Sequence, residues 1–218
     1  MEIENIIFDF NGTILDDLDI CYKLLNEMLV MTHHEPVSKD KYLHIFTFPV
    51  YDYYKKAGFN FDKEPMDDFK ELSSYFVKRY YSQFDTLQVF HDVLDFFKRY
   101  YNKYNLYLLS ATKESDLVLV TKKLDIYKYF KKVIGTGDIY ASTKLGVAES
   151  YFNKYPIDFT KTMFIGDTLH DNEIAKHFNS VSVLINRGHQ AKDVLESGNP
   201  NYLLDNMDQV ISILEGEK

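Results

Sequence analysis

Acidic residues follow two short apolar segments of the chain. Asp9 comes directly after the run Ile6–Phe8, and Asp167 ends the segment 162–167, with Asp171 four residues further on. Parallel strands end at one edge of their sheet, where open α/β sheets bind ligands. We therefore expect the three carboxylates to meet there, in a hard, oxygen-rich site that suits Mg²⁺ better than zinc. For Asp171 alone, a first-turn acid favoured by the helix dipole is an equal alternative.

The residues after Asp9 form a turn that could approach an anion. Gly12 allows backbone N–H groups to come close to a phosphate, and Thr13 could cap a helix that follows. Both are candidate phosphate contacts. Taken alone, such a string is as often a plain strand-to-loop cap.

Two later segments bring further groups that could bind an anion. The strand expected at 105–109 ends at Ser110 and leads into a helix, so the Ser110 hydroxyl and the backbone at Ala111 could hold a phosphate. Lys144 begins a helix expected over 143–153, where a cation opposes the helix dipole and needs an anionic partner. An ordinary helix cap and a solvated surface lysine are the simpler alternatives.

In this order, Asp9, Ser110, Lys144 and the pair Asp167 and Asp171 resemble the four motifs of the haloacid dehalogenase (HAD) superfamily, most of whose members are Mg²⁺-dependent phosphotransferases. The similarity covers nearly the whole chain. It is nearest to the phosphoglycolate-phosphatase-like branch, in which a helical cap is inserted after the first motif. The motifs are specific for the superfamily and not for a substrate.

The resemblance implies a role for each matching residue. Asp9 would be the nucleophile, Ser110 would hydrogen-bond the transferred phosphoryl group, and Lys144 would neutralise its charge and orient Asp9. Asp167 would bind Mg²⁺, and Asp171 would do so directly or through water. The implied metal ligands are Asp9, the backbone carbonyl of Asn11, Asp167 and Asp171; the expected phosphate contacts are Asp9, Gly12, Thr13, Ser110, Ala111 and Lys144.

Asn11 is the main departure from the family pattern, which usually has a second aspartate there as general acid and then general base. An amide cannot exchange a proton, and the loss of such help costs about 10²–10⁴-fold. We expect a phosphoenzyme that favours good leaving groups and turns over slowly. His44, His170 or His189 could stand in for the acid, although each is interpreted as a surface or structural histidine. Ala111 stands where an asparagine is common.

The function expected is that of an enzyme, a phosphomonoester hydrolase or phosphotransferase acting on a small, phosphoglycolate-like metabolite. One alternative is a phosphonatase-like C–P hydrolase, which needs a Schiff-base lysine such as Lys55 or Lys56. The other is a catalytically impaired module that binds a phosphorylated ligand, with Asn11 marking the lost chemistry.

Strands and helices alternate along most of the chain, which predicts an α/β fold with a doubly wound parallel sheet. Residues 16–85 break this rhythm and read as helices only. We therefore predict an α/β core of residues 1–15 and 86–218 with a helical cap at 16–85. The cap helices are expected from Leu18 to Leu29, after Ser38, from Pro49 to Gly58, and from Pro65 to Tyr81.

Composition limits the other classes of protein. The formal charge of −8 disfavours nucleic-acid binding. The single Cys21 rules out an internal disulfide bond and suits a reducing compartment. The chain has no apolar run of about 18 residues and no signal-like N-terminus, so we expect a cytoplasmic protein without membrane contact. The oligomeric state stays open.

Overall fold

Strand β1, Asn5–Phe8, lies inside a six-stranded sheet with the order β5–β4–β1–β6–β7–β8. The computed structural model describes residues 2–62, 67–137 and 143–216. All adjacent strands of this sheet pair in parallel. The other strands are β4 (Asn105–Lys113), β5 (Lys132–Thr136), β6 (Thr162–Gly166), β7 (Val181–Ile185) and β8 (Tyr202–Leu204).

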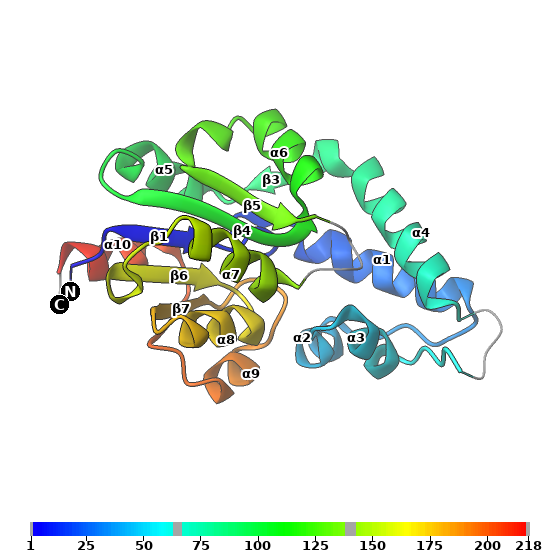
Figure 1. Ribbon diagram of the computed structural model, residues 1–218. Helices are drawn as coiled ribbons and strands as arrows, with labels where there is room; N and C mark the ends of the chain where they lie inside the picture. The colour runs from blue at the N-terminus through cyan, green and yellow to red at the C-terminus, as the bar shows by residue number, and fades with distance from the viewer. Residues whose placement is uncertain (1, 63–66, 138–142, 217–218) are drawn as a thin grey trace.

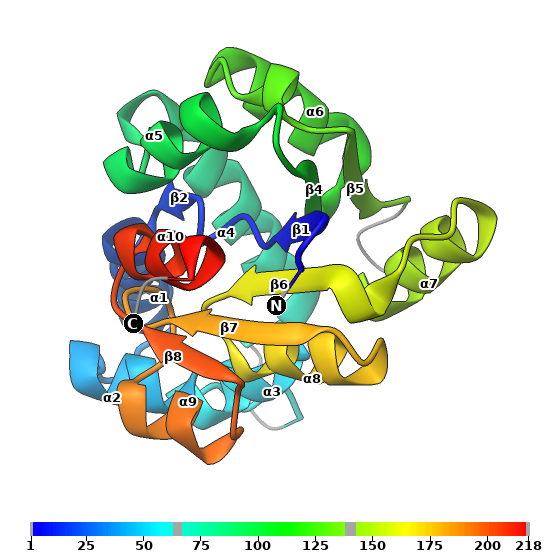
Figure 2. The ribbon, with the colours of Figure 1, turned by 90° about the vertical axis from the view of Figure 1, so that its left-hand side faces the viewer.

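Successive strand residues point to opposite sides of the sheet, and apolar residues occupy both sides. Helices therefore cover both faces. Ile6 and Phe8 pack into the core on one face, and Ile7 packs into the core on the other. Figure 2 shows α5 and α10 on one side of the sheet and α7 and α8 on the other. These helices are α5 (His91–Tyr100), α6 (Glu114–Lys123), α7 (Lys144–Lys154), α8 (Leu169–His177), α9 (Lys192–Ser197) and α10 (Met207–Glu215). The doubly wound α/β sheet predicted from the sequence is confirmed.

In the described residues between β2 and β3, four α-helices form a separate helical unit, which lies beyond the carboxyl ends of the strands and far from both termini (Figure 1). They are α1 (Leu18–Met31), α2 (Lys39–Ile45), α3 (Val50–Ala57) and α4 (Phe69–Ser82). Their buried faces make a hydrophobic cluster of their own, centred on Met28, Tyr42 and Leu72. The chain enters and leaves this unit through a short antiparallel ribbon of β2 (Leu15–Asp16) and β3 (Gln88–Val89).

Capping residues mark the ends of several of these helices. Ser38 caps α2 by accepting a hydrogen bond from the backbone N–H of Lys41, and Gly58 ends α3 with a φ of 134°. The predicted start of α4 at Pro65 lies outside the described residues. The helix itself begins at Phe69, because the side chain of Asp68 caps it there.

Several elements differ from the expectation, among them the unpredicted short strands β2 and β3. Strand β4 continues past Ser110 to Lys113, with an irregularity in its pairing with β5 after Leu109. Helix α9 and strand β8 were not predicted, because both are short and carry little periodicity. Within the parts of the chain that the structure describes, no helix is long and apolar enough to cross a bilayer.

Candidate active site

Lys144 joins two of the three expected carboxylates. It is the first residue of α7, its side chain is 5% exposed, and its ammonium donates hydrogen bonds to Asp9 and Asp171. Asp9 follows β1, and Asp171 lies in the first turn of α8. A buried lysine at a helix N-terminus is unfavourable unless anions compensate it. The two carboxylates supply that compensation, so the solvated-lysine alternative is wrong.

Asp167 completes the acidic cluster from the end of β6. Its Oδ1 accepts a hydrogen bond from the Thr13 hydroxyl at 3.1 Å, and its Oδ2 accepts one from the backbone N–H of His189 at 2.7 Å. The residue is 1% exposed. Two loops, one after β1 and one after β7, therefore hold this carboxylate in place.

Asp171 has two structural roles at once. Its Oδ2 accepts hydrogen bonds from the hydroxyl of Thr168 at 2.6 Å and from the backbone N–H of Thr168 at 3.1 Å, forming a capping box with α8. Its Oδ1 accepts from Lys144. Asp171 is thus a first-turn acid of α8, and it also belongs to the carboxylate cluster through Lys144.

The cluster carries more negative charge than its own cation can balance. Burial, reinforced by Asp171 and Asp167 and opposed by Lys144, raises the pKa of Asp9 well above its usual range. Burial also raises the pKa of Asp167 to about 6. At Asp171 burial acts in the same direction, but the Lys144 ammonium outweighs it and lowers the pKa.

The donor set fits a hard divalent cation. One carboxylate oxygen from each of Asp9, Asp167 and Asp171 lies within 4.8 Å of the others. Three carboxylates against one ammonium leave two negative charges, which a divalent ion would balance. Carboxylate oxygens are the ligands that Mg²⁺ prefers in proteins. These residues could therefore hold a metal ion.

Two predicted phosphate contacts are engaged elsewhere. The backbone N–H of Gly12 points to Asp17 Oδ1 at 2.8 Å and to the carbonyl of Leu15 at 3.0 Å. Thr13 caps no helix, because α1 begins only at Leu18; its hydroxyl donates to Asp167 instead. The turn after Asp9 thus organises neighbouring carboxylates in this structure.

Ser110 is buried beside the cluster without a hydrogen bond to it. Its hydroxyl donates to the Thr112 hydroxyl and accepts from the Thr112 backbone N–H, both at 3.1 Å. The strand does not end at Ser110 as expected, because β4 runs on to Lys113, and α6 follows at Glu114. Ala111 is exposed, and its carbonyl accepts from the Thr136 hydroxyl at 3.1 Å.

The Asn11 side chain belongs to a second polar network, formed with Asp17 and Tyr80. Its amide nitrogen donates to Asp17 Oδ2 at 2.6 Å and to the hydroxyl oxygen of Tyr80 at 2.8 Å. Tyr80 in turn donates to Asp17 at 2.8 Å. Asp17 lies directly before α1, and its partners Tyr80 and His189 come from distant parts of the chain.

His189 is the residue that sequence reasoning undervalued. It is 3% exposed, its Nε2 lies 3.2 Å from Asp17 Oδ1, and its Nδ1 lies 2.9 Å from the Tyr42 hydroxyl. Burial lowers its pKa, but Asp17 and Asp167 outweigh burial and raise it to about 9. The same ion pair, with hydrogen bonds from Asn11 and Tyr80, overcomes burial and lowers the pKa of Asp17. Because the backbone N–H of His189 donates to Asp167, His189 also lies beside the carboxylate cluster.

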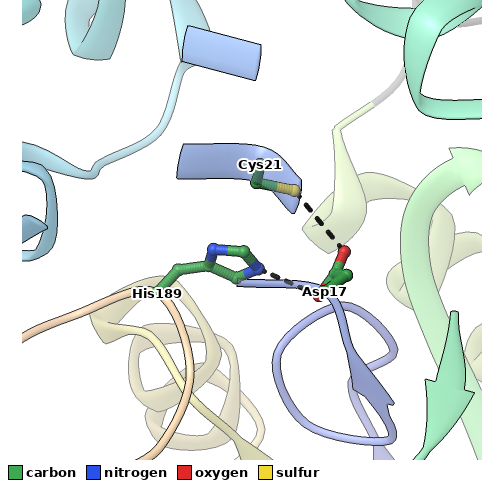
Figure 3. A group of neighbouring side chains, drawn as sticks. All are labelled: Asp17, Cys21 and His189. Atoms are coloured by element: carbon green, nitrogen blue, oxygen red, sulfur yellow. Dashed lines mark hydrogen bonds and ion pairs between the residues drawn. The ribbon is translucent and has the colours of Figure 1, made fainter. Parts of the chain in front are cut away.

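Asp17, Cys21 and His189 form another group whose donor atoms lie close together (Figure 3). The Cys21 thiol donates to Asp17 at 3.6 Å, and burial with the nearby Asp17 charge raises the pKa of that thiol. Hydrogen bonds account for each contact in this group without an ion. The other two candidate histidines lie further out: His170 is partly exposed beside Phe48, and His44 is exposed.

The fold and the site define an α/β protein with a buried acidic cluster at the carboxyl ends of its parallel strands. The family model of the haloacid dehalogenase-like hydrolases matches residues 6–185, so the chain belongs to this family. A pyrophosphatase PpaX from Anoxybacillus flavithermus is 23% identical over 223 residues, which cover 98% of each chain.

Solved structures show the same fold along the whole chain. A haloacid dehalogenase-like family hydrolase from Streptococcus pneumoniae has a TM-score of 0.81 at 18% identity, covering 97% of this chain and 98% of its own. A predicted phosphoglycolate phosphatase from Haemophilus somnus has a TM-score of 0.76 at 14% identity, covering 98% of both chains. The resemblance inferred from the four motifs is confirmed.

Proposed function

We propose that the chain is a Mg²⁺-dependent phosphomonoester hydrolase or phosphotransferase that acts on a small phosphorylated metabolite through an aspartyl phosphate on Asp9. The observation that carries this proposal is the buried cluster in which Lys144 joins Asp9 and Asp171 beside Asp167. The names of the relatives, a pyrophosphatase and a predicted phosphoglycolate phosphatase, support a phosphoryl-group substrate.

In the first step, a carboxylate oxygen of Asp9 attacks phosphorus, and the bond to the leaving-group oxygen breaks with its electron pair. Lys144 offsets the repulsion between two anions and orients Asp9. Ser110, at the neighbouring strand, is proposed to donate a hydrogen bond to a phosphoryl oxygen. In the second step, water attacks phosphorus, the bond to Asp9 breaks, and a proton goes to solvent with inorganic phosphate.

The proposed metal ligands are Asp9, Asp167 and Asp171, with the backbone carbonyl of Asn11. When bound, Mg²⁺ supplies positive charge that lets an anionic nucleophile and an anionic phosphate approach each other. Thr13 and His189 keep Asp167 oriented for this role through the two hydrogen bonds on its carboxylate.

Asn11 restricts the leaving group. Its amide nitrogen donates to Asp17 and Tyr80, and an amide has no proton to transfer to a departing oxygen. The leaving oxygen must therefore depart as an anion, which favours phosphoanhydrides, acyl phosphates and aryl phosphates over alkyl phosphates. We propose slow turnover for alkyl esters, by about 10²–10⁴-fold relative to a site with an acid.

The helical unit is proposed to be a cap over this site, with residues 1–15 and 86–218 as the catalytic core and 16–85 as the cap. Its separate hydrophobic cluster and the β2–β3 ribbon at its base support this division. Phe46 at the end of α2 stacks on His189, with 4.9 Å between ring centroids. A cap in this position would exclude water during phosphoryl transfer.

The test is Mg²⁺-dependent phosphate release from p-nitrophenyl phosphate, pyrophosphate, acetyl phosphate and glycerol 1-phosphate, with Asp9→Asn as the control. We expect release from the first three substrates that requires both Mg²⁺ and Asp9, and much slower release from the alkyl ester. Equal activity of Asp9→Asn would overturn the proposal. Tight Mg²⁺-dependent phosphate binding without any turnover would favour a binding module instead. No observation favours C–P hydrolysis, since Lys55 and Lys56 are both exposed on α3.

A further inference from the structure

Asp17 is a buried carboxylate that accepts hydrogen bonds from three separate segments: the turn after β1, helix α4 and the loop after β7. Its Oδ1 accepts from the backbone N–H of Gly12 at 2.8 Å and from His189 Nε2 at 3.2 Å. Its Oδ2 accepts from the amide of Asn11 at 2.6 Å and from the hydroxyl of Tyr80 at 2.8 Å. Asp17 itself is 1% exposed. A carboxylate with this many donors is held in one orientation.

The chemistry of these contacts assigns the orientation of Asn11. The carboxylate of Asp17 offers only acceptors, so the group of Asn11 that lies 2.6 Å away must be the NH₂ group. A flipped amide would place two oxygens at that distance in a buried site, which is repulsive. Asp17 thus determines which way the side chain two residues after Asp9 faces.

We propose that Asp17 is a positioning residue that fixes the orientation of the Asn11 amide, two residues after the nucleophile, so that positions 11 and 17 form a reciprocal amide–carboxylate pair. This inference rests on the proposed function, because it concerns the same site. The pair tolerates one amide and one carboxylate in either order. Two carboxylates would place acceptor against acceptor, and two amides would leave the donors of Gly12, His189 and Tyr80 without a carboxylate to bind.

Tyr80 extends this pair into the helical unit. It lies on α4, donates to Asp17 and accepts from Asn11. A second tyrosine of that unit, Tyr42 on α2, contacts His189, the other side-chain partner of Asp17 Oδ1. The orientation of Asn11 therefore depends on contacts from both parts of the fold.

A double-mutant cycle tests the reciprocity. The variants are Asn11→Asp, Asp17→Asn and the double variant Asn11→Asp/Asp17→Asn, compared with the wild type for thermal unfolding and for hydrolysis of p-nitrophenyl phosphate. We expect each single variant to lower kcat/KM at least tenfold and to unfold at a lower temperature. The double variant should recover both quantities, because the amide at position 17 then donates to the carboxylate at position 11.

A second readout of the cycle distinguishes positioning from simple packing. In the double variant, position 11 carries a group that can exchange a proton, so turnover of glycerol 1-phosphate relative to the aryl ester should rise at least tenfold. Asn11→Asp alone should not give this rise. Additive losses in the double variant, or a full gain from Asn11→Asp alone, would overturn the inference.

The two proposals fail in different ways. If the wild type shows no Asp9-dependent hydrolysis, the proposed function is wrong. The unfolding temperature of the double variant then still shows whether positions 11 and 17 form a pair. If hydrolysis depends on Asp9 but the cycle is additive, only the inference about Asp17 is wrong.

Tyr80→Phe tests the link to α4, with Tyr81→Phe as the control on the next, partly exposed residue of that helix. Loss of the Tyr80 hydroxyl removes one donor to Asp17 and one acceptor for Asn11. We expect kcat to fall three- to tenfold with little change in KM, while the control behaves like the wild type. Equal effects of the two variants would remove Tyr80 from the network.

Discussion

Gly12 and Asp167 approach so closely that a Cβ atom at Gly12 would lie 2.3 Å from Oδ2 of Asp167. The same Cβ would lie 2.7 Å from the ring of His189, and Gly12 has a φ of +71°. The turn after Asp9 therefore leaves no room for a side chain. This contact joins the β1 loop to the β6 carboxylate.

Gly12→Ala is expected to disrupt the site. The new methyl group strains the backbone, at a cost of about 1–3 kcal/mol in the free energy of unfolding, and it must also displace Asp167. We expect at least a tenfold loss of aryl phosphate hydrolysis and a lower unfolding temperature. Gly137→Ala is the control, since a Cβ there meets no atom of the described residues within 4 Å. Wild-type behaviour of Gly12→Ala would contradict the close contact.

Lys144→Met should remove the cation of the cluster at nearly constant volume. Asp9 and Asp171 then lose their partner in a buried place, so the free energy of unfolding without metal should fall by about 3 kcal/mol. Turnover of an aryl phosphate should fall at least 100-fold. Lys154→Met, at the exposed end of the same helix, is the control. A variant with normal turnover would exclude Lys144 from catalysis.

Mg²⁺ should stabilise the folded chain through the carboxylate cluster. At a concentration of 100 times its Kd, the ion would add about 2.7 kcal/mol to the free energy of unfolding. Differential scanning fluorimetry with and without EDTA measures this shift. We expect Asp167→Asn to abolish it, while Asp193→Asn, at an exposed position, keeps it. The same shift in Asp167→Asn would place the ion elsewhere.

The pair of His189 and Asp17 predicts a pH dependence of stability. The pKa of His189 rises from an ordinary 6.5 to about 9 in the folded state, so the folded state holds the proton more tightly. Its contribution to stability is complete below pH 6.5 and is lost as the pH rises to 9. Urea unfolding in EDTA should show this decline in the wild type. The decline in the free energy of unfolding should be smaller in His189→Gln than in the wild type. His91→Gln, which replaces an exposed residue, should show the same decline as the wild type. Parallel curves for the wild type and His189→Gln would refute the linkage.

Much of the fold could be predicted from the sequence because its signals are local. The apolar runs before Asp9 and Asp167 predicted β1 and β6, and helix caps such as Ser38 and Gly58 predicted the ends of α2 and α3. The cap of α4 is equally local, since the side chain of Asp68 accepts from the backbone N–H of Glu71. The short elements α9 and β8 carry too few residues for a period to be visible.

The sequence by itself determined the family, the alternation of strands and helices, and the acidic residues Asp9, Asp167 and Asp171 at strand ends, because these signals depend on neighbours along the chain. Only the tertiary structure decided that Lys144 bridges two of these carboxylates and that Asp17 holds Asn11. Asp17 and His189 are 172 residues apart. Their contact depends on how the strands and the helical unit pack together, which no local pattern records.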